Sequence, residues 1–164
     1  MPVTTAQPTV NPELVVHFVR SVQTVLSTMV GVQTRIGAPH LKTQPVPSYD
    51  VSGIIGFSGG VVGSMVVSFQ TATAVKLVAR FAGAEMAPDT ADFADAIGEL
   101  ANMIAGNAKK DLGAIASITV PSVIIGAGHH IARLADVPCV VIPCQTEVGD
   151  FAVEVSIKQL PAAK

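Results

Sequence analysis

The chain has 164 residues, of which 49% are hydrophobic and 13% are charged, and its formal net charge is −2. This length fits one domain with its own core, and the absence of any basic run gives nucleic-acid binding no electrostatic basis. The mean hydropathy of +0.54 raises the question of membrane insertion, but the longest weakly polar run, residues 114–128, is broken by Pro121 and is shorter than the roughly 20 apolar residues of a spanning helix.

The first residues resemble a loosely attached lead-in. They contain no basic region followed by an apolar block, so we expect no signal peptide and a cytoplasmic protein. We divide the chain into a flexible segment over residues 1–10 and a single domain over residues 11–160. The sparse charge indicates that part of the surface is buried against another subunit, and we therefore expect a homodimer.

Apolar residues at helical spacing predict two helices in the first half of the chain. The first begins after Asn11, a good N-cap, and stops near Gly31. The second takes Thr71 as its cap and ends near Gly83. Both end at glycine because this residue adopts the left-handed backbone of a helix C-terminus without strain.

The β-rich segments predict a mainly antiparallel sheet. Two β-branched runs flank the glycine-containing turn at residues 58–60, which favours a hairpin over a phosphate-binding loop. Residues 37–48 form a proline-rich connector. Further strands are expected over residues 117–126, 137–144 and 151–158, and the last alternates as a half-buried strand does. This order of elements predicts an α+β fold with helices packed on the sheet.

Cysteine and histidine give no metal or disulfide signal. Cys139 and Cys144 are five apart, which on a strand points them to opposite faces. We expect two reduced thiols that pack as small apolar side chains. The adjacent His129 and His130 lack a clear third ligand and are predicted to be loop residues.

The third predicted helix, over residues 87–113, is the longest, with Asp89 or Thr90 as its cap and Gly113 at its end. At about 100° per residue, its outer sector contains Asp92, Asp95, Glu99, Asn102, Gly106 and Lys110. The opposite, core-facing sector contains Ala94, Ile97, Leu100, Ala101, Ile104, Ala108 and Leu112.

Within that outer sector, Glu99 and Asn102 are side-by-side neighbours. Gly98 and Gly106 each destabilise a helix interior by up to about 1 kcal/mol relative to alanine, whereas small residues let a partner approach closely. The pair has no nucleophile–base pair or metal cluster beside it and is not a complete hydrolase. Such a pair is also common on exposed helix faces, but it can complete a site that a partner supplies.

The segment DAIGELANMIAGNAKK carries a resemblance to a known family. It resembles the signature Asp/Ser-x-x-x-Glu-x-x-Asn of the CheX family of chemotaxis phosphatases, here Asp95, Glu99 and Asn102. Other segments agree in order, so the resemblance spans nearly the whole chain; they are residues 11–29, 52–69 and 121–129. The sequence is similar also to the broader CheC and flagellar-switch group, whose fold is a pseudo-duplicated pair of helix-plus-strand repeats.

The number of signature helices distinguishes CheC proteins, which usually carry two, from CheX proteins, which carry one. When the first predicted helix is aligned on the third, Val25 falls at Glu99 and Thr28 falls at Asn102. The first copy therefore lacks the polar pair, which points to the single-site CheX type with a CheC-like fold.

The resemblance implies dephosphorylation of a phospho-aspartate on a CheY-like response regulator. It implies that Asn102 orients the attacking water and that Glu99 pairs with the regulator's lysine, while Asp95, Gly98 and Gly106 are candidate partner contacts. Mg²⁺ is expected in the regulator, with no cofactor in this chain. CheX-type proteins are also expected to dimerise. Two alternatives stay open: a non-catalytic CheC-like or flagellar-switch-type module that binds phosphorylated regulator, and a plain structural oligomer.

Overall fold

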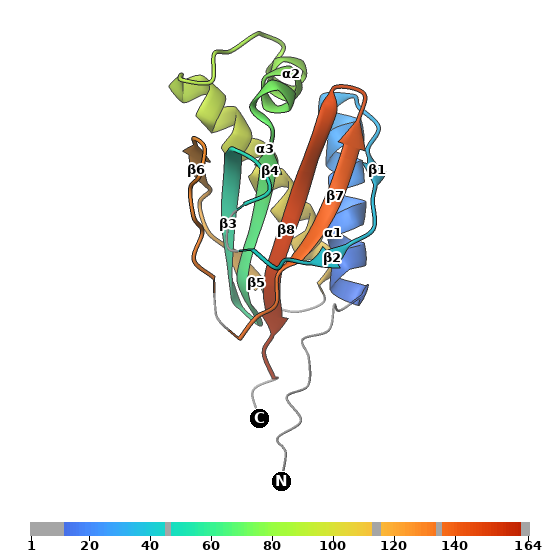
Figure 1. The fold of residues 1–164 in the computed structure, drawn as a ribbon. Coiled ribbons are helices and arrows are strands. Elements are labelled where there is room, and N and C mark those ends of the chain that lie inside the picture. Colours follow the sequence, from blue (N-terminus) through green and yellow to red (C-terminus); the bar gives the residue numbers. More distant parts are fainter. Residues whose placement is uncertain (1–11, 45–46, 113–115, 134–135, 162–164) are drawn as a thin grey trace.

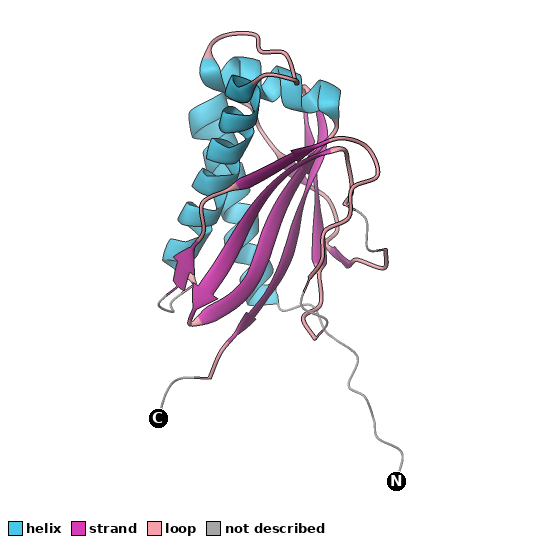
Figure 2. Ribbon diagram, turned by 90° about the vertical axis from the view of Figure 1, so that its left-hand side faces the viewer, coloured by secondary structure: helices cyan, strands magenta, loops and turns pink. Residues whose placement is uncertain are grey.

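The computed structural model describes residues 12–44, 47–112, 116–133 and 136–161. In this part of the chain, helices cover one face of an eight-stranded sheet whose strand pairs are all antiparallel (Figures 1 and 2). The predicted α+β class is thereby confirmed. None of the helices described is both long and apolar enough to cross a membrane.

The strands form one continuous sheet. They are β1 (Arg35–Ile36), β2 (His40–Leu41), β3 (Val51–Gly59), β4 (Val61–Phe69), β5 (Ala116–Ile118), β6 (Ser122–Ile125), β7 (Val140–Thr146) and β8 (Gly149–Gln159). Their order is β1-β7-β8-β4-β3-β5, with β2 also on β7 and β6 also on β3. The predicted hairpin is present as β3 and β4, which pair from Val51↔Phe69 to Phe57↔Gly63.

The first helix is α1 (Pro12–Val25), continued by a π-helical turn, η1 (Leu26–Val30). Gly31 ends it with a left-handed backbone, φ 76°, as predicted. The predicted cap Asn11 lies outside the described residues. Phe18, Val22 and Leu26 are buried against the sheet and the third helix.

The second helix, α2 (Thr71–Ala82), corrects one prediction. Thr71 is its first residue and not its cap; the N-cap is Gln70, whose side chain makes no capping hydrogen bond. The cause is the tight connection, because β4 ends at Phe69 and leaves a single extended residue before the helix. Gly83 ends α2 with φ 73°, as predicted.

The third helix, α3 (Ala91–Asp111), crosses the sheet diagonally beside α1 (Figure 1). Of the two predicted caps, Thr90 serves, since its Oγ1 accepts a hydrogen bond from the backbone N of Phe93 at 3.3 Å. The C-cap is Leu112, and the predicted stop at Gly113 lies outside the described residues.

Two strand predictions are wrong in detail. Residues 117–126 form two strands, β5 and β6, because Pro121 has no N–H to donate to a ladder. The proline-rich connector contains a strand, since β2 pairs with β7 at His40↔Val141 and Leu41↔Val140. The connection between β5 and β6 packs on α3, where Pro121 lies against Gly98.

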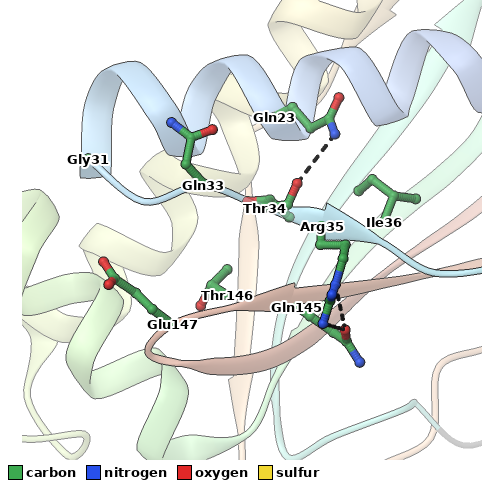
Figure 3. Close-up of a pocket in the computed structure, with 9 residues that line it drawn as sticks. All are labelled: Gln23, Gly31, Gln33, Thr34, Arg35, Ile36, Gln145, Thr146 and Glu147. Carbon is green, nitrogen blue, oxygen red and sulfur yellow. Dashed lines mark hydrogen bonds between the residues drawn. The ribbon is translucent and has the colours of Figure 1, made fainter.

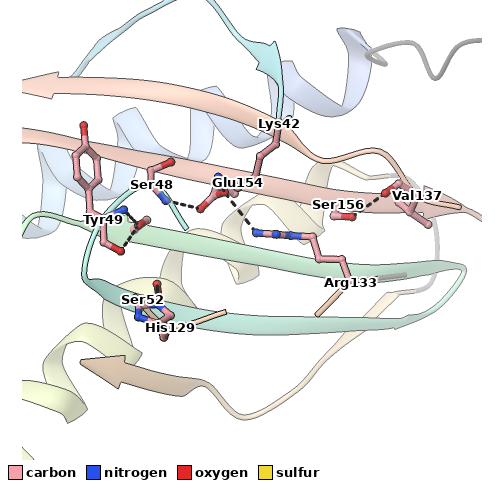
Figure 4. A network of polar contacts seen from close by, with 10 residues as sticks. Lys42, Ser48, Tyr49, Ser52, His129, Arg133, Val137, Glu154 and Ser156 are labelled. Atoms are coloured by element: carbon pink, nitrogen blue, oxygen red, sulfur yellow. Dashed lines mark hydrogen bonds and ion pairs between the residues drawn. The ribbon is translucent and has the colours of Figure 1, made fainter. Parts of the chain in front are cut away.

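Long connections cover the middle of the second face of the sheet (Figure 2), where Ser52, Ser68 and Glu154 are buried. For this reason β8 is not half-buried as predicted, because Ala152, Glu154 and Ser156 are almost fully buried as well. The Glu154 carboxylate forms ion pairs with the Lys42 ammonium at 2.6 Å and the Arg133 guanidinium at 3.4 Å (Figure 4). It also accepts a hydrogen bond from the Ser48 backbone N at 3.3 Å. A buried charge needs such partners, and they hold both connections on the sheet.

His129 and Cys139 lie near this face, whereas Cys144 belongs to the core between the sheet and the helices. His129 Nε2 is 2.8 Å from Ser52 Oγ (Figure 4). Its Nδ1 is 2.7 Å from the Gly126 carbonyl, and His130 is exposed. Cys139 and Cys144 are both free thiols. Desolvation raises the pKa of the Cys144 thiol to about 12.

Candidate functional site

The outer face of α3 carries the polar residues that the helical period predicted. Asp95 and Glu99 are exposed, and Asn102 and Gly106 are half-buried. On the opposite face Ile97, Leu100, Ala101, Ile104 and Ala108 are buried in the core. Ala94 is half-buried instead of buried, because it lies at the edge of a groove described below. The structure therefore brings Glu99 and Asn102 together on a solvated helix face.

Close packing against the sheet fixes the position of α3. Gly53 of β3 lies directly beneath it, and a Cβ atom there would be 3.0 Å from the Ala101 Cβ and 3.4 Å from Ile97 Cγ2. On the side of α1, the buried Ser21 hydroxyl donates a hydrogen bond to the Ile104 carbonyl at 2.5 Å. Because both neighbours hold the helix, its outer side chains are presented from a rigid support.

Gly98 has a role within its own chain. It is buried, and a Cβ atom there would lie 3.3 Å from Pro121 Cγ and 3.5 Å from Val123 Cγ2. The glycine thus lets the β5–β6 connection lie close on α3. This packing within the chain accounts for a glycine in the helix interior, without any contact to another protein. A contact between Gly98 and another protein remains a prediction.

Gly106 differs from Gly98. A Cβ atom at this position would meet only the Ile118 Cδ1 atom, at 4.0 Å, which is ordinary contact. No packing in the described part of the chain therefore requires a glycine here. For Gly106, contact with a partner protein remains a prediction, and we propose below that this contact is the reason for the glycine.

A groove of about 520 Å³ lies beside the carboxylates of Asp95 and Glu99. It is lined by Ala94, Asp95, Gly98, Glu99, Val120, Pro121 and Val123. One wall is the outer face of α3 and the other is the β5–β6 connection with the start of β6. This second wall has no signal in the sequence, because Val120 lies 21 positions from Glu99 and belongs to no polar motif.

Neither the Asp95 nor the Glu99 carboxylate is neutralised by a cation of the described residues. Among the ion pairs of the described residues, none involves Asp95 or Glu99. The described residues also contain no group of three or more His, Cys, Asp or Glu side chains that could hold a metal ion. The site consequently offers anionic and carboxamide groups to an incoming partner.

A larger cavity, of about 880 Å³, lies elsewhere, between the segment from Gly31 to β1 and the end of β7 (Figure 3). Its charged groups have partners in the chain: Arg35 donates to Gln145 Oε1 from Nε at 3.2 Å and from a terminal nitrogen at 3.0 Å, and Glu147 pairs with Arg80 at 2.6 Å. No residue of α3 lines it. Size alone therefore does not identify the functional site.

The first helix, α1 with its continuation η1, shows the aligned positions without the polar pair. Val25 is buried, with 5% of its surface exposed, and Thr28 is exposed with its hydroxyl donating to the Thr24 carbonyl at 2.7 Å. A carboxylate–carboxamide face is thus present on α3 and absent from α1.

Comparison with known proteins identifies the family. Residues 51–145, more than half of the chain, match the family described as chemotaxis phosphatase CheX. The chain belongs to the CheX family. The matched region contains all of α3, with Asp95, Glu99 and Asn102, and the β5–β6 connection that packs on it.

The CheX relatives cover nearly the whole chain. The CheY-P phosphatase CheX of Thermotoga maritima is 30% identical over 142 residues, which span 84% of this chain and 91% of that protein. The crystal structure of a chemotaxis protein CheX from Desulfovibrio desulfuricans shares 35% identity at a TM-score of 0.80, covering 90% of this chain and 99% of that one. The predicted CheC-like fold is thereby confirmed.

A third structure is a CheX–CheY–BeF₃–Mg²⁺ complex from Borrelia burgdorferi. It matches with 24% identity and a TM-score of 0.74, over 91% of this chain and 100% of that one. At this identity the likeness shows the shared fold.

Proposed function

We propose that this CheX-family chemotaxis phosphatase hydrolyses the phospho-aspartate of a CheY-like response regulator with Asn102 and Glu99 as its working residues. The observation that carries the proposal is the exposed Glu99 next to Asn102 on a helix that is fixed by its neighbours. The membership in a family of phosphatases supports the reaction type, and the name of the Thermotoga relative supports the substrate.

The reaction needs a water molecule in line with the bond between phosphorus and the aspartyl oxygen. The water oxygen attacks phosphorus, the aspartyl carboxylate leaves, and inorganic phosphate is released. The carboxamide of Asn102 has both a donor and an acceptor, so it can hold this water by two hydrogen bonds. Orientation of a reactant lowers the activation free energy without any covalent chemistry by the enzyme.

Glu99 is proposed to set the docking geometry. Its carboxylate has no ion pair in the described structure, and a lysine of the regulator would supply one. Asp95, one turn earlier on the same exposed face, is proposed as a further partner contact. Gly106 is proposed to let the regulator approach the helix closely, and Gly98, which Pro121 covers, is proposed to contact the regulator only through the groove that it lines.

The regulator is proposed to bring the electrostatic part of the site. Its Mg²⁺ would neutralise charge on the phosphoryl group, and this chain would add no cofactor of its own. We also propose that the protein is a cytoplasmic homodimer. The low content of charged residues, 13%, supports a buried subunit contact, and light scattering in solution would measure it.

The test follows the loss of phosphate from a CheY-type regulator charged with acetyl phosphate. Asn102→Ala should lower kcat about a hundredfold, while binding of the regulator weakens less, because water orientation concerns the transition state. Glu99→Ala should raise KM. Asn107→Ala is the matched control, since it removes a half-buried carboxamide of α3 away from the outer face.

Two results would contradict the proposal in different ways. Equal rates of phosphate loss with the parent, Asn102→Ala and Glu99→Ala would show that neither residue takes part in the hydrolysis. Stoichiometric capture of phosphorylated regulator by the parent without faster phosphate loss would favour a binding module in place of an enzyme.

A further inference from the structure

We propose that Val120, at the outer rim of the groove beside Glu99, is a docking contact that selects the regulator for this phosphatase. The inference rests on the proposed function, because the occupant is the same regulator that presents its phospho-aspartate to Asn102. It adds a residue from outside the signature helix, and an apolar element, to a site that otherwise consists of polar groups.

The first observation is the exposure of an apolar side chain at this position. Val120 is 85% exposed, whereas the other exposed large hydrophobic residues of the described chain are between 41% and 45% exposed. A single exposed apolar residue is common on protein surfaces. Its location on the wall of the same groove as Asp95 and Glu99 gives it significance here.

The second observation is that the segment carrying Val120 is held in place on both sides. Before it, the Thr119 backbone N donates to the Gly56 carbonyl at 3.0 Å, and the Gly56 backbone N donates to Thr119 Oγ1 at 2.9 Å. After it, Pro121 packs on Gly98. The valine is therefore preorganised, and binding through it would lose little conformational entropy.

The third observation is the chemistry of the two walls. Asp95 and Glu99 place two carboxylates without ion pairs on one wall, and Val120, Pro121 and Val123 make the other wall apolar. Such a groove is complementary to a protein surface on which a basic side chain lies next to an apolar one. We assign this strip to the regulator surface that flanks its phosphorylated aspartate, since Glu99 belongs to the groove and Asn102 lies one turn beyond it.

This arrangement separates two tasks along one helix. Asn102 is half-buried and does not line the groove, so it acts on the water alone. The groove binds the regulator equally well in the ground state and in the transition state of the reaction. Changes at Val120 should therefore alter KM and leave kcat unchanged, whereas changes at Asn102 should lower kcat more than they weaken binding.

The experiment compares Val120→Ser, Val120→Ile and Ile125→Ser with the parent. Ile125 is the matched control, because it is an exposed apolar residue of the same sheet edge, 41% exposed, that does not line the groove. Hydrolysis of acetyl-phosphate-charged regulator gives kcat and KM, and titration with regulator loaded with BeF₃ and Mg²⁺ gives the binding constant directly. Light scattering gives the mass of each variant.

Val120→Ser removes both methyl groups of the side chain and adds a hydroxyl group. The change should raise KM and the dissociation constant about tenfold at unchanged kcat. Val120→Ile should retain both constants, and Ile125→Ser should match the parent. The valine is almost fully exposed, so none of these differences would reflect a loss of folding.

Each contrary outcome has a distinct meaning. An active parent with KM unchanged in Val120→Ser overturns the docking contact and leaves the proposed function intact. A lower mass for Val120→Ser than for the parent overturns it too, because the valine would then contact a second copy of the chain. A parent that binds through Val120 without accelerating hydrolysis supports the contact and overturns the enzymatic function. A parent that neither binds nor hydrolyses overturns both.

Discussion

The helices α1 and α3 lie side by side on one face of the sheet and use their outer positions differently (Figure 1). In α3, Glu99 is exposed and Asn102 is beside it. At the aligned positions of α1 and its continuation η1, Val25 is buried and the Thr28 hydroxyl donates a hydrogen bond within its own helix. Packing a helix on this sheet evidently does not require a polar pair. The pair on α3 is therefore not explained by the fold, which is the reason to assign it a function.

The largest expected effect comes from introducing the Glu99 carboxylate of α3 at the aligned position of α1. Val25→Glu would place a carboxylate in the apolar core, where no cation is available among the packed residues of the described structure. We expect the free energy of unfolding to fall by about 3 kcal/mol or more, as measured by denaturant unfolding.

The matched change at the partner position should have almost no effect. Thr28→Asn replaces an exposed side chain whose hydroxyl bonds only within the helix, and we expect a change within about 0.5 kcal/mol. Similar small losses for both variants would show that Val25 does not face the core, and that α1 and α3 do not differ in the way described.

The second prediction concerns how close α3 lies to the sheet. Gly53→Ala adds a Cβ atom 3.0 Å from the Ala101 Cβ, which cannot rotate away. We expect a loss of about 1–3 kcal/mol in unfolding free energy, as for other overpacked cores, together with a lower kcat because Asn102 moves with the helix.

A double-variant cycle tests the cause of that loss. Ala101→Gly removes the opposing methyl group, so the double variant should lose less stability than the sum of the two single variants. Strict additivity would show that the loss comes from the β3 strand itself and not from the contact between Gly53 and Ala101.

Helical periodicity predicted the outer face of α3 because the period is a local property of the backbone. The same holds for Gly31 and Gly83, whose left-handed conformations end their helices. By contrast, the preference of threonine for the N-cap position predicts Thr71 as the cap of α2, whereas the short connection after Phe69 places Gln70 there. Local preference was overruled by the geometry of the neighbouring strand.

Contacts between distant segments were not accessible from the sequence. Alternation along β8 correctly grouped Ala152, Glu154 and Ser156 on one face, but it could not show that the connections carrying Lys42 and Arg133 cover that face. The two-residue strands β1 and β2 are too short to show a period. The groove beside Glu99 depends on such a distant contact as well, because its second wall comes from the β5–β6 connection.

The smallest expected effect distinguishes structural from functional glycine on α3. Gly106→Ala should raise the unfolding free energy by up to about 1 kcal/mol, since alanine favours helix and the nearest atom to the new Cβ, Ile118 Cδ1, is 4.0 Å away. Gly98→Ala is the comparison, because its Cβ would press on Pro121 at 3.3 Å and offset that gain. If Gly106 contacts the regulator, the more stable variant should bind BeF₃-loaded regulator more weakly. A variant that gains stability and keeps full affinity would show that the glycine at this position serves neither the fold nor the partner.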